Sequence, residues 1–155
     1  MVKIVTGSIN SYKSTRLMNY FKQNPIGDGF ISRKIMKDSL VYGYNLQRLS
    51  SGKEISFVIR DIFWDEKKSV LYKLGPYCFY EDAFLYLENI IDNFIKNNVN
   101  PVYLDEIGIL ELNSQGFDRI LKKLVKAKID LCLVVRSDLI DKVCERYGFD
   151  EFEII

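Results

Sequence analysis

The sequence predicts an α/β fold, in which a mostly parallel sheet is flanked by helices and carries an antiparallel β insertion in the middle third. The first observation behind this prediction is that strand-like and helix-like segments alternate at both ends of the chain. The second is a run of strand-like segments in the middle, separated only by turns. The third is the length, because 155 residues, of which 48% are hydrophobic, suffice for one ordinary core. We therefore expect residues 1–155 to form a single domain.

The first third of the chain has the order strand, loop, helix. A β-branched run from Val2 to Thr6 ends at Gly7 and predicts a strand. From Ser14 onward the spacing of apolar residues is that of a helix, which Pro25 and the glycines after it end. The apolar face of this helix is made by Leu17, Met18, Tyr20 and Phe21.

The middle third is predicted to be the antiparallel insertion. Strands are expected at Phe30 to Met36, Val41 to Leu49 and Ile55 to Phe63. Turns are expected near Asp38-Ser39 and Ser50-Ser51-Gly52, so these strands follow one another as hairpins. The aromatic residues of this region could stack on a nucleobase, although packing within the insertion is the more ordinary role.

The last third returns to alternating helices and strands. Helices are predicted for Glu81 to Asn97 and around Phe117 to Val125, where apolar residues recur every three or four positions. Strands are predicted at Val102 to Asp105, opened by Pro101, and at Asp130 to Val135. Such alternation predicts a parallel sheet with helices on both faces.

The C-terminal segment is expected to be a helix followed by an edge strand. Ser137 is placed to cap a helix from Asp138 to Tyr147, and Gly148 is placed to end it. Phe149 to Ile155 is then predicted to be the last strand.

Composition excludes several classes of function. The chain has no histidine, which excludes serine–histidine and cysteine–histidine catalysis and histidine-based metal sites. Cys78, Cys132 and Cys144 are widely spaced and indicate buried structural thiols. A net charge of +1 disfavours bulk nucleic-acid binding. The start of the sequence resembles no export signal and no apolar run would span a bilayer, so we expect a cytoplasmic protein without membrane association.

The loop after the first strand has the context of a phosphate-binding loop. Such a loop, with the pattern G-x-x-x-x-G-K-S/T between a strand and a helix, directs backbone N–H groups at phosphates. Lys13 fits the lysine that neutralises phosphate charge, and Ser14 fits the hydroxyl that binds Mg²⁺. Tyr12 stands where the second glycine is expected, so a plain β–α loop containing a lysine is the alternative. The candidate nucleotide-binding residues are Gly7, Ser8, Ile9, Asn10, Ser11, Tyr12, Lys13, Ser14 and Thr15.

Two adjacent carboxylates end the strand that begins after Pro101. Ligands of parallel sheets bind at the carboxyl ends of the strands, so Asp105 and Glu106 are expected beside the phosphate loop. Asp105 would belong to the Mg²⁺ shell, and Glu106 would orient or deprotonate the attacking water. The alternative is that two acidic residues merely begin a turn. The phosphate-binding loop around Lys13 and the carboxylate pair occur in the right order, about ninety residues apart, and this favours the catalytic interpretation.

Several segments together resemble the small thermophile-type nucleoside-triphosphatases, a family of P-loop proteins related to nucleotide kinases and ATPases. The most specific of them has the pattern D-E-I-G-x-x-E-L. The segments are Gly7 to Thr15, Gly29-Phe30, Gly43-Tyr44, Leu74-Gly75-Pro76-Tyr77, Asp105 to Leu112, Arg136 to Asp138 and Phe152-Glu153-Ile154. The resemblance implies a P-loop NTPase fold, Mg²⁺-dependent hydrolysis of several nucleoside triphosphates, and the roles given above for Lys13, Ser14, Asp105 and Glu106.

The loop departs from the family pattern G-P-P-G-V-G-K-T-T. Ser8, Ile9, Asn10 and Tyr12 replace its two prolines and two glycines. Leu40 and Val41 also stand where basic residues often precede the second glycine–aromatic pair. These departures bear on turnover more than on the fold.

Two further residues are candidates for the site. Arg136 follows a predicted core strand and should emerge at the same sheet edge as Asp105, where it could reach the γ-phosphate as a catalytic arginine. Alternatively, Arg136 could form an ion pair with Asp138 or be exposed to solvent, which is about equally reasonable. Glu111 lies in the family-like segment, and its role could equally be a structural ion pair.

Three functions are compatible with these residues. The preferred one is a Mg²⁺-dependent nucleoside-triphosphatase of broad base preference. The second is a nucleotide or small-molecule kinase, in which Glu106 would activate an acceptor hydroxyl, although the sequence shows no acceptor pocket. The third is a degenerate, non-catalytic P-loop module with a regulatory or assembly role, for which Tyr12 is the main support.

Overall fold

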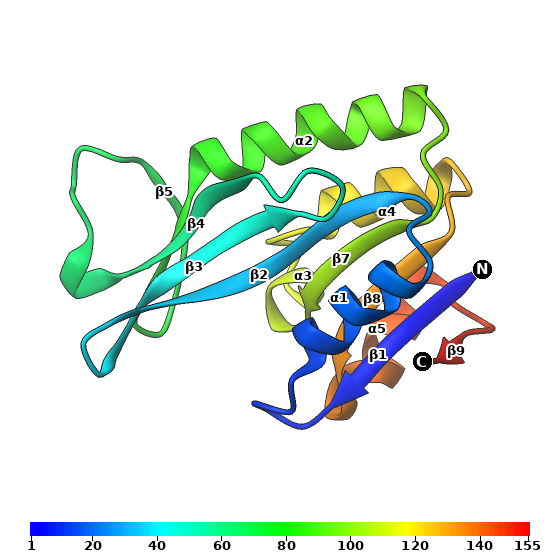
Figure 1. Cartoon of the computed structure of the whole chain (residues 1–155), viewed down its shortest axis with the longest axis horizontal. Helices are drawn as coiled ribbons and strands as arrows, with labels where there is room; N and C mark the ends of the chain where they lie inside the picture. Colours follow the sequence, from blue (N-terminus) through cyan, green and yellow to red (C-terminus); the bar gives the residue numbers. More distant parts are fainter.

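The chain forms one nine-stranded sheet with helices on both faces, as described by a computed structural model of residues 1–155 (Figure 1). The strands lie in the order β5-β6-β4-β3-β2-β7-β8-β1-β9. In chain order the elements are β1 (Val2–Gly7), α1 (Lys13–Gln23), β2 (Asp28–Lys37), β3 (Leu40–Arg48), β4 (Glu54–Arg60), η1 (Asp61–Phe63), β5 (Val70–Leu74), β6 (Tyr77–Tyr80), α2 (Glu81–Lys96), β7 (Val102–Ile107), α3 (Ile109–Leu112), α4 (Asp118–Lys126), β8 (Leu131–Arg136), η2 (Ser137–Leu139), α5 (Ile140–Tyr147) and β9 (Glu153–Ile154).

The sheet has a parallel half and an antiparallel half. Strands β2, β7, β8, β1 and β9 pair in parallel, whereas β2, β3, β4, β6 and β5 pair as antiparallel neighbours. β2 belongs to both halves, so the insertion extends the parallel sheet instead of forming a separate layer (Figure 1). The predicted parallel core and antiparallel insertion are both confirmed.

Side-chain alternation along the parallel strands divides the core into two layers. On one face Val5, Tyr103 and Val134 pack against Leu17 and Phe21 of α1. The residues that alternate with them face α2, α4 and α5 on the other side and belong to the larger cluster. Burial of apolar residues on both faces of β7 and β8 is typical of a parallel sheet covered by helices. No helix has the length and apolar character needed to cross a membrane.

Three predicted elements differ in extent from the structure. β4 ends at Arg60, because Asp61 turns the chain by accepting a hydrogen bond of 2.8 Å from the N–H of Ile62. The helix expected from Asp138 begins as the short 3-10 turn η2, and the Ser137 hydroxyl accepts no capping hydrogen bond from a backbone N–H. The last strand is limited to β9, because the Phe149 N–H donates to the carbonyl of Cys144 and closes α5.

The sequence does not predict three of the elements, β5, β6 and α3. The hairpin of β5 and β6 closes the free edge of the insertion, and the single turn α3 follows β7. All three are short, and none contains enough residues to show a clear periodicity.

Candidate functional site

The candidate site lies at the edge of the sheet where β1, β7 and β8 end. Gly7 at the end of β1 is paired with Arg136 at the end of β8, and Ile107 of β7 is paired with Val135. The loop before α1 and the carboxylates of β7 therefore meet at one edge, as is usual for ligand sites of parallel sheets. Around this edge is a cavity of about 690 Å³, here called the phosphate-loop cavity. Its lining includes the whole segment from Asn10 to Thr15, together with Ser32 and Glu106.

Lys13 is buried without a counter-charge. Only 7% of the residue is exposed, and the side chain forms no ion pair. Its Nζ atom folds back over the loop and donates a hydrogen bond of 2.6 Å to the carbonyl of Ser8, which also accepts one of 2.8 Å from Ser11 Oγ. A buried ammonium without a carboxylate partner is costly. Lys13 and the free N–H groups at the start of α1 thus form a cationic cradle suited to an anion.

Tyr12 adopts the left-handed backbone conformation expected of the glycine that it replaces. Its φ and ψ are 57° and 32°, and Asn10 also has a positive φ of 59°. The Tyr12 residue is 80% exposed, so its ring points away from the loop. The ring therefore leaves the cradle accessible, although Tyr12 still contributes to the lining of the phosphate-loop cavity. The tyrosine backbone nevertheless stores strain of about 1–3 kcal/mol.

Replacing Tyr12 with glycine is expected to give triphosphate binding at least as tight as in the parent, and faster hydrolysis. Glycine adopts the same backbone conformation without steric strain and leaves Lys13 in place. Isothermal titration calorimetry and phosphate release measure the two effects. Asp38→Gly is the matched control, because Asp38 has a positive φ of 55° in the distant turn between β2 and β3. Weaker nucleotide binding by Tyr12→Gly alone would show that the tyrosine ring itself contacts the nucleotide.

Asp105 is the most deeply buried carboxylate of the site. The residue is 1% exposed, and its Oδ2 atom accepts a hydrogen bond of 2.8 Å from the N–H of Ser32 on β2. Its Oδ1 atom is buried and has no hydrogen-bond partner. Burial, together with the nearby charge of Glu106, raises the pKa of Asp105 to about 7, whereas the neighbouring Ser14 hydroxyl acts in the opposite direction. An unsatisfied buried oxygen beside Ser14 is the feature that a cation would satisfy.

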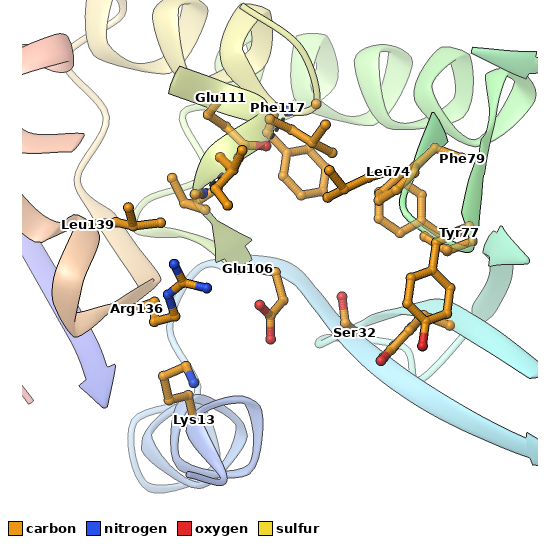
Figure 2. A pocket seen from close by; sticks show the side chains of 18 of the residues that line it. Lys13, Ser32, Leu74, Tyr77, Phe79, Glu106, Glu111, Phe117, Arg136 and Leu139 are labelled. Atoms are coloured by element: carbon orange, nitrogen blue, oxygen red, sulfur yellow. Dashed lines mark hydrogen bonds between the residues drawn. The ribbon is translucent and has the colours of Figure 1, made fainter. Parts of the chain in front are cut away.

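Glu106 points out of the sheet although it directly follows Asp105. Its φ is 61°, and the pairing of β7 with β8 shifts register between Leu104 and Ile107. This irregularity makes Asp105 buried and leaves Glu106 exposed in the cavity. In Figure 2 the Glu106 carboxylate lies between Lys13 and Ser32. Positive φ at a non-glycine residue is a strained conformation that often marks functional sites.

A family model described as an NTPase matches residues 3–154. The chain belongs to the NTPase family. Membership supports nucleoside-triphosphate binding and hydrolysis as the general function, in agreement with the resemblance found in the sequence. Among curated proteins, no match to this NTPase family member was found.

Two solved structures share the fold of this NTPase family member. The crystal structure of THEP1 from the hyperthermophile Aquifex aeolicus matches with a TM-score of 0.70 and 20% identity, over 100% of this chain and 88% of that one. The solution structure of a human cancer-related nucleoside triphosphatase matches with a TM-score of 0.63 and 15% identity, over 100% of this chain and 86% of that one. At these identities the likeness establishes the fold, and it confirms the predicted P-loop NTPase class.

The side chains of this NTPase family member fit a Mg²⁺ ion held jointly with a nucleotide. No group of three or more cysteine, aspartate or glutamate side chains could hold a metal by itself. Mg²⁺ in phosphoryl-transfer sites usually takes only one or two protein ligands, and phosphates and water supply the rest. The unpartnered Oδ1 of Asp105 and the Ser14 hydroxyl are suited to those positions.

The raised pKa of Asp105 predicts a pH dependence of stability in the absence of metal and nucleotide. The ordinary pKa is 3.8 and the folded pKa is about 7, so the folded state keeps a proton that the unfolded state loses in this range. The free energy of unfolding should therefore fall as pH rises through this window, by about 4 kcal/mol at most. Asp105→Asn keeps an acceptor for the Ser32 N–H but has no group that titrates in this range. The variant should therefore lack the part of the decrease in unfolding free energy that comes from Asp105.

Urea unfolding of parent and Asp105→Asn on both sides of pH 7 tests this expectation. We also expect the variant to show a weaker Mg²⁺ dependence of nucleotide binding, because the amide cannot supply an anionic ligand. Asp28→Asn is a comparison carboxylate that is buried but saturated by the Arg48 guanidinium and Ser50. A parent and an Asp105→Asn variant with the same pH profile would contradict the assignment.

Arg136 reaches the site but is paired. Its guanidinium donates a hydrogen bond of 2.7 Å from Nη2 to Asp138 Oδ2, which is the alternative role considered from the sequence. The side chain also lines a second cavity together with Lys13 and Glu106 (Figure 2). Nε and Nη2 are taken by Asp138, which leaves Nη1 as the free end of the guanidinium for contact with a γ-phosphate.

Glu111 organises the main chain after β7 and makes no ion pair. Its Oε2 accepts a hydrogen bond of 2.8 Å from the Gly108 N–H, and its Oε1 accepts one of 2.8 Å from the Phe117 N–H. Both oxygens are therefore used by the backbone, which holds α3 and the start of α4 together. Burial raises the pKa of Glu111, while these two N–H groups oppose the rise.

Ser32 and Tyr44 also belong to the site, although the sequence does not predict this. Ser32 supplies the N–H that holds Asp105, and both residues line the two cavities. Burial raises the pKa of Tyr44 to about 12, with contributions from Tyr77 and Glu106, so its hydroxyl stays protonated at neutral pH. Ser32 comes close to Asp105 because β2 pairs with β7. The sequence of either strand alone does not predict this pairing.

Proposed function

We propose that the protein binds a nucleoside triphosphate with Mg²⁺ at the loop before α1 and hydrolyses it to the diphosphate and phosphate. The observation that carries this proposal is the presence, at one edge of the sheet, of a buried cationic side chain without a counter-charge and a buried carboxylate with an unpartnered oxygen. The cationic side chain is Lys13, and the carboxylate is Asp105. A triphosphate with its metal ion complements both groups at once.

Each side chain has a distinct role in the proposed reaction. The backbone of residues 7–15 and the Lys13 ammonium bind the phosphates, and Ser14 and Asp105 hold the metal. Glu106 orients the attacking water and accepts its proton, and the free Nη1 of Arg136 stabilises charge on the γ-phosphate. When bound, Mg²⁺ neutralises charge on the phosphate oxygens.

Broad base preference is part of the proposal. The groups recognised at the site would contact phosphates and a bound cation. All nucleoside triphosphates share the phosphates, so these groups do not distinguish one base from another. The exposed ring of Tyr12 supports a usable loop and favours an enzyme over a non-catalytic module.

Phosphate release from a panel of ATP, GTP, CTP and UTP, with and without Mg²⁺, tests this function beside direct nucleotide titration. We expect release to require Mg²⁺ and to vary little with the base. Binding without release would leave a nucleotide-dependent module, and the absence of both would overturn the proposal.

A further inference from the structure

A second cavity, of about 330 Å³, opens directly beside the phosphate-loop cavity. We call it the aromatic cavity, since five rings contribute to its wall (Figure 2). These rings belong to Tyr44, Phe57, Tyr77, Phe79 and Phe117. The two cavities share the residues Asn10, Lys13, Ser32, Tyr44 and Glu106. A molecule in one cavity would therefore meet a molecule in the other at the Glu106 carboxylate.

We propose that the aromatic cavity binds a neutral, single-ring aromatic compound with a hydroxyl group, and that this hydroxyl accepts the γ-phosphoryl group of the nucleoside triphosphate. The proposal rests on the proposed binding of a triphosphate at the loop. It adds an acceptor, so that the protein acts as a small-molecule kinase and hydrolysis is transfer to water in the absence of this acceptor.

The rings of the aromatic cavity are fixed by contacts with one another. Phe57 stacks on Phe117 with ring centroids 5.7 Å apart and an interplanar angle of 17°. Phe79 meets Phe57 edge to face at 5.4 Å, and Tyr77 meets Tyr44 edge to face at 5.7 Å. Rigid rings in these orientations present both faces and edges, which favours an aromatic ligand over a flexible aliphatic one. The volume is near the lower end for ligand pockets and matches one ring system.

The charges around the aromatic cavity favour a neutral acceptor. Its only cationic lining residues are Lys13, which lies at the junction with the loop, and Arg136, whose charge is paired with Asp138 and whose free Nη1 is assigned to the γ-phosphate. Both oxygens of Glu111 are occupied by backbone N–H groups. No free cation thus lines the aromatic wall to bind a second anionic group. An acceptor that already carries a phosphate, such as a nucleoside monophosphate, would lack a counter-charge there.

Glu106 is placed to serve this transfer at the junction of the cavities. The acceptor oxygen attacks the γ-phosphorus, and the bond between that phosphorus and the bridging oxygen of the β-phosphate breaks. The electron pair leaves with the nucleoside diphosphate, and the hydroxyl proton passes to the Glu106 carboxylate. The products are a phosphate monoester of the aromatic compound and a nucleoside diphosphate.

The test combines a binding measurement and a transfer measurement on the full chain. Phenol, benzyl alcohol, hydroxypyridine and hydroxymethylpyridine serve as probes, with cyclohexanol as the aliphatic and hydroxymethylbenzoate as the anionic comparison. Ligand-observed NMR at millimolar probe concentration, without nucleotide, measures binding, since ligands of this size bind weakly. Phosphorus NMR with Mg²⁺ and ATP then detects the new phosphate monoester.

Leu74→Trp and Leu71→Trp form a matched pair for this test. Both residues are on β5 with similar exposure, 41% for Leu74 and 45% for Leu71, but only Leu74 lines the aromatic cavity. The larger indole at position 74 should fill the cavity and lower aromatic binding and transfer at least tenfold. Leu71→Trp should leave both unchanged. Thermal unfolding confirms that both variants are folded.

Binding of the neutral aromatic alcohols and formation of their phosphate monoesters would support the proposal, whether or not hydrolysis is also seen. It is overturned if none of the aromatic probes binds, if none is phosphorylated while ATP is consumed, or if the anionic probe is preferred. Competition between the aromatic probes and ATP would also overturn it, because the cavity would then hold the nucleobase. Absence of ATP binding with intact aromatic binding would instead count against the proposed function.

Discussion

Replacing Lys13 with alanine is expected to abolish triphosphate binding or hydrolysis while leaving the fold intact. The ammonium is buried beside the loop without a carboxylate partner, so its charge is available to the ligand. Hydrogen bonds to charged groups contribute about 1.5–3 kcal/mol each, and a loss of at least about 100-fold in affinity follows if the phosphates use more than one. The Ser8 carbonyl keeps its hydrogen bond from Ser11, so the loop retains an internal contact in the variant.

Isothermal titration with ATP and Mg²⁺, followed by phosphate release, measures the effect of Lys13→Ala. Lys13→Met separates charge from packing, because methionine retains an apolar stem of similar length in the buried position. Lys126→Ala on the exposed end of α4 is the control for removal of a lysine charge. A folded Lys13→Ala variant with the affinity and rate of the parent would exclude a phosphate-binding role for the loop.

Glu106→Gln is expected to retain nucleotide binding and to lower the rate of hydrolysis by about 100-fold or more. The amide has the size of the carboxylate but cannot accept the proton of water, and general bases typically contribute factors of about 10²–10⁴. The residue is exposed in the cavity, so the substitution leaves the packing of β7 unchanged. Single-turnover phosphate release separates this loss from any change in product dissociation.

The contrast with Asp105→Asn makes the Glu106 experiment specific. A metal ligand and a base differ in readout, because the first changes the Mg²⁺ dependence and the second changes the rate at saturating Mg²⁺. Glu145→Gln on α5 provides an exposed glutamate outside the site. Small and equal effects of Glu106→Gln and Asp105→Asn would mean that the two carboxylates only begin a turn.

Local sequence was sufficient for the parts of the site that lie within one segment. The loop before α1 was predicted, because a strand, a short loop with Lys13 and a helix follow one another without interruption. The strand that carries Asp105 was also predicted, but its end was not, since β7 continues to Ile107. The backbone of Glu106 was not predicted, since an apolar run favours a regular strand and the positive φ depends on the register with β8. The 3-10 turn that begins at Ser137 was also not predicted, because a serine followed by a helical segment is the usual pattern of a capped α-helix.

The aromatic cavity could not be predicted from the sequence. Its rings come from β3, β4, β6 and the start of α4, and their proximity depends on pairings between strands that are distant in the chain. β5 alternates poorly between buried and exposed residues, because it forms the edge of the sheet. Aromatic composition therefore indicated a packed insertion, whereas only the folded arrangement shows that one side of that packing remains open.

The sheet forks between β2 and β7, and this fork makes the room in which both cavities lie. Pairing of the two strands ends at Phe30 and Leu104, although β2 continues to Lys37 (Figure 1). The next available N–H on this side, that of Ser32, is taken by the Asp105 side chain instead of a strand carbonyl. A side chain thus closes the ladder where the backbones part. One arm of the fork, β3 to β6, carries most of the rings of the aromatic cavity, and the other arm carries the phosphate loop and the two carboxylates. A change in the first arm can therefore alter the aromatic cavity without moving the groups that face the phosphates.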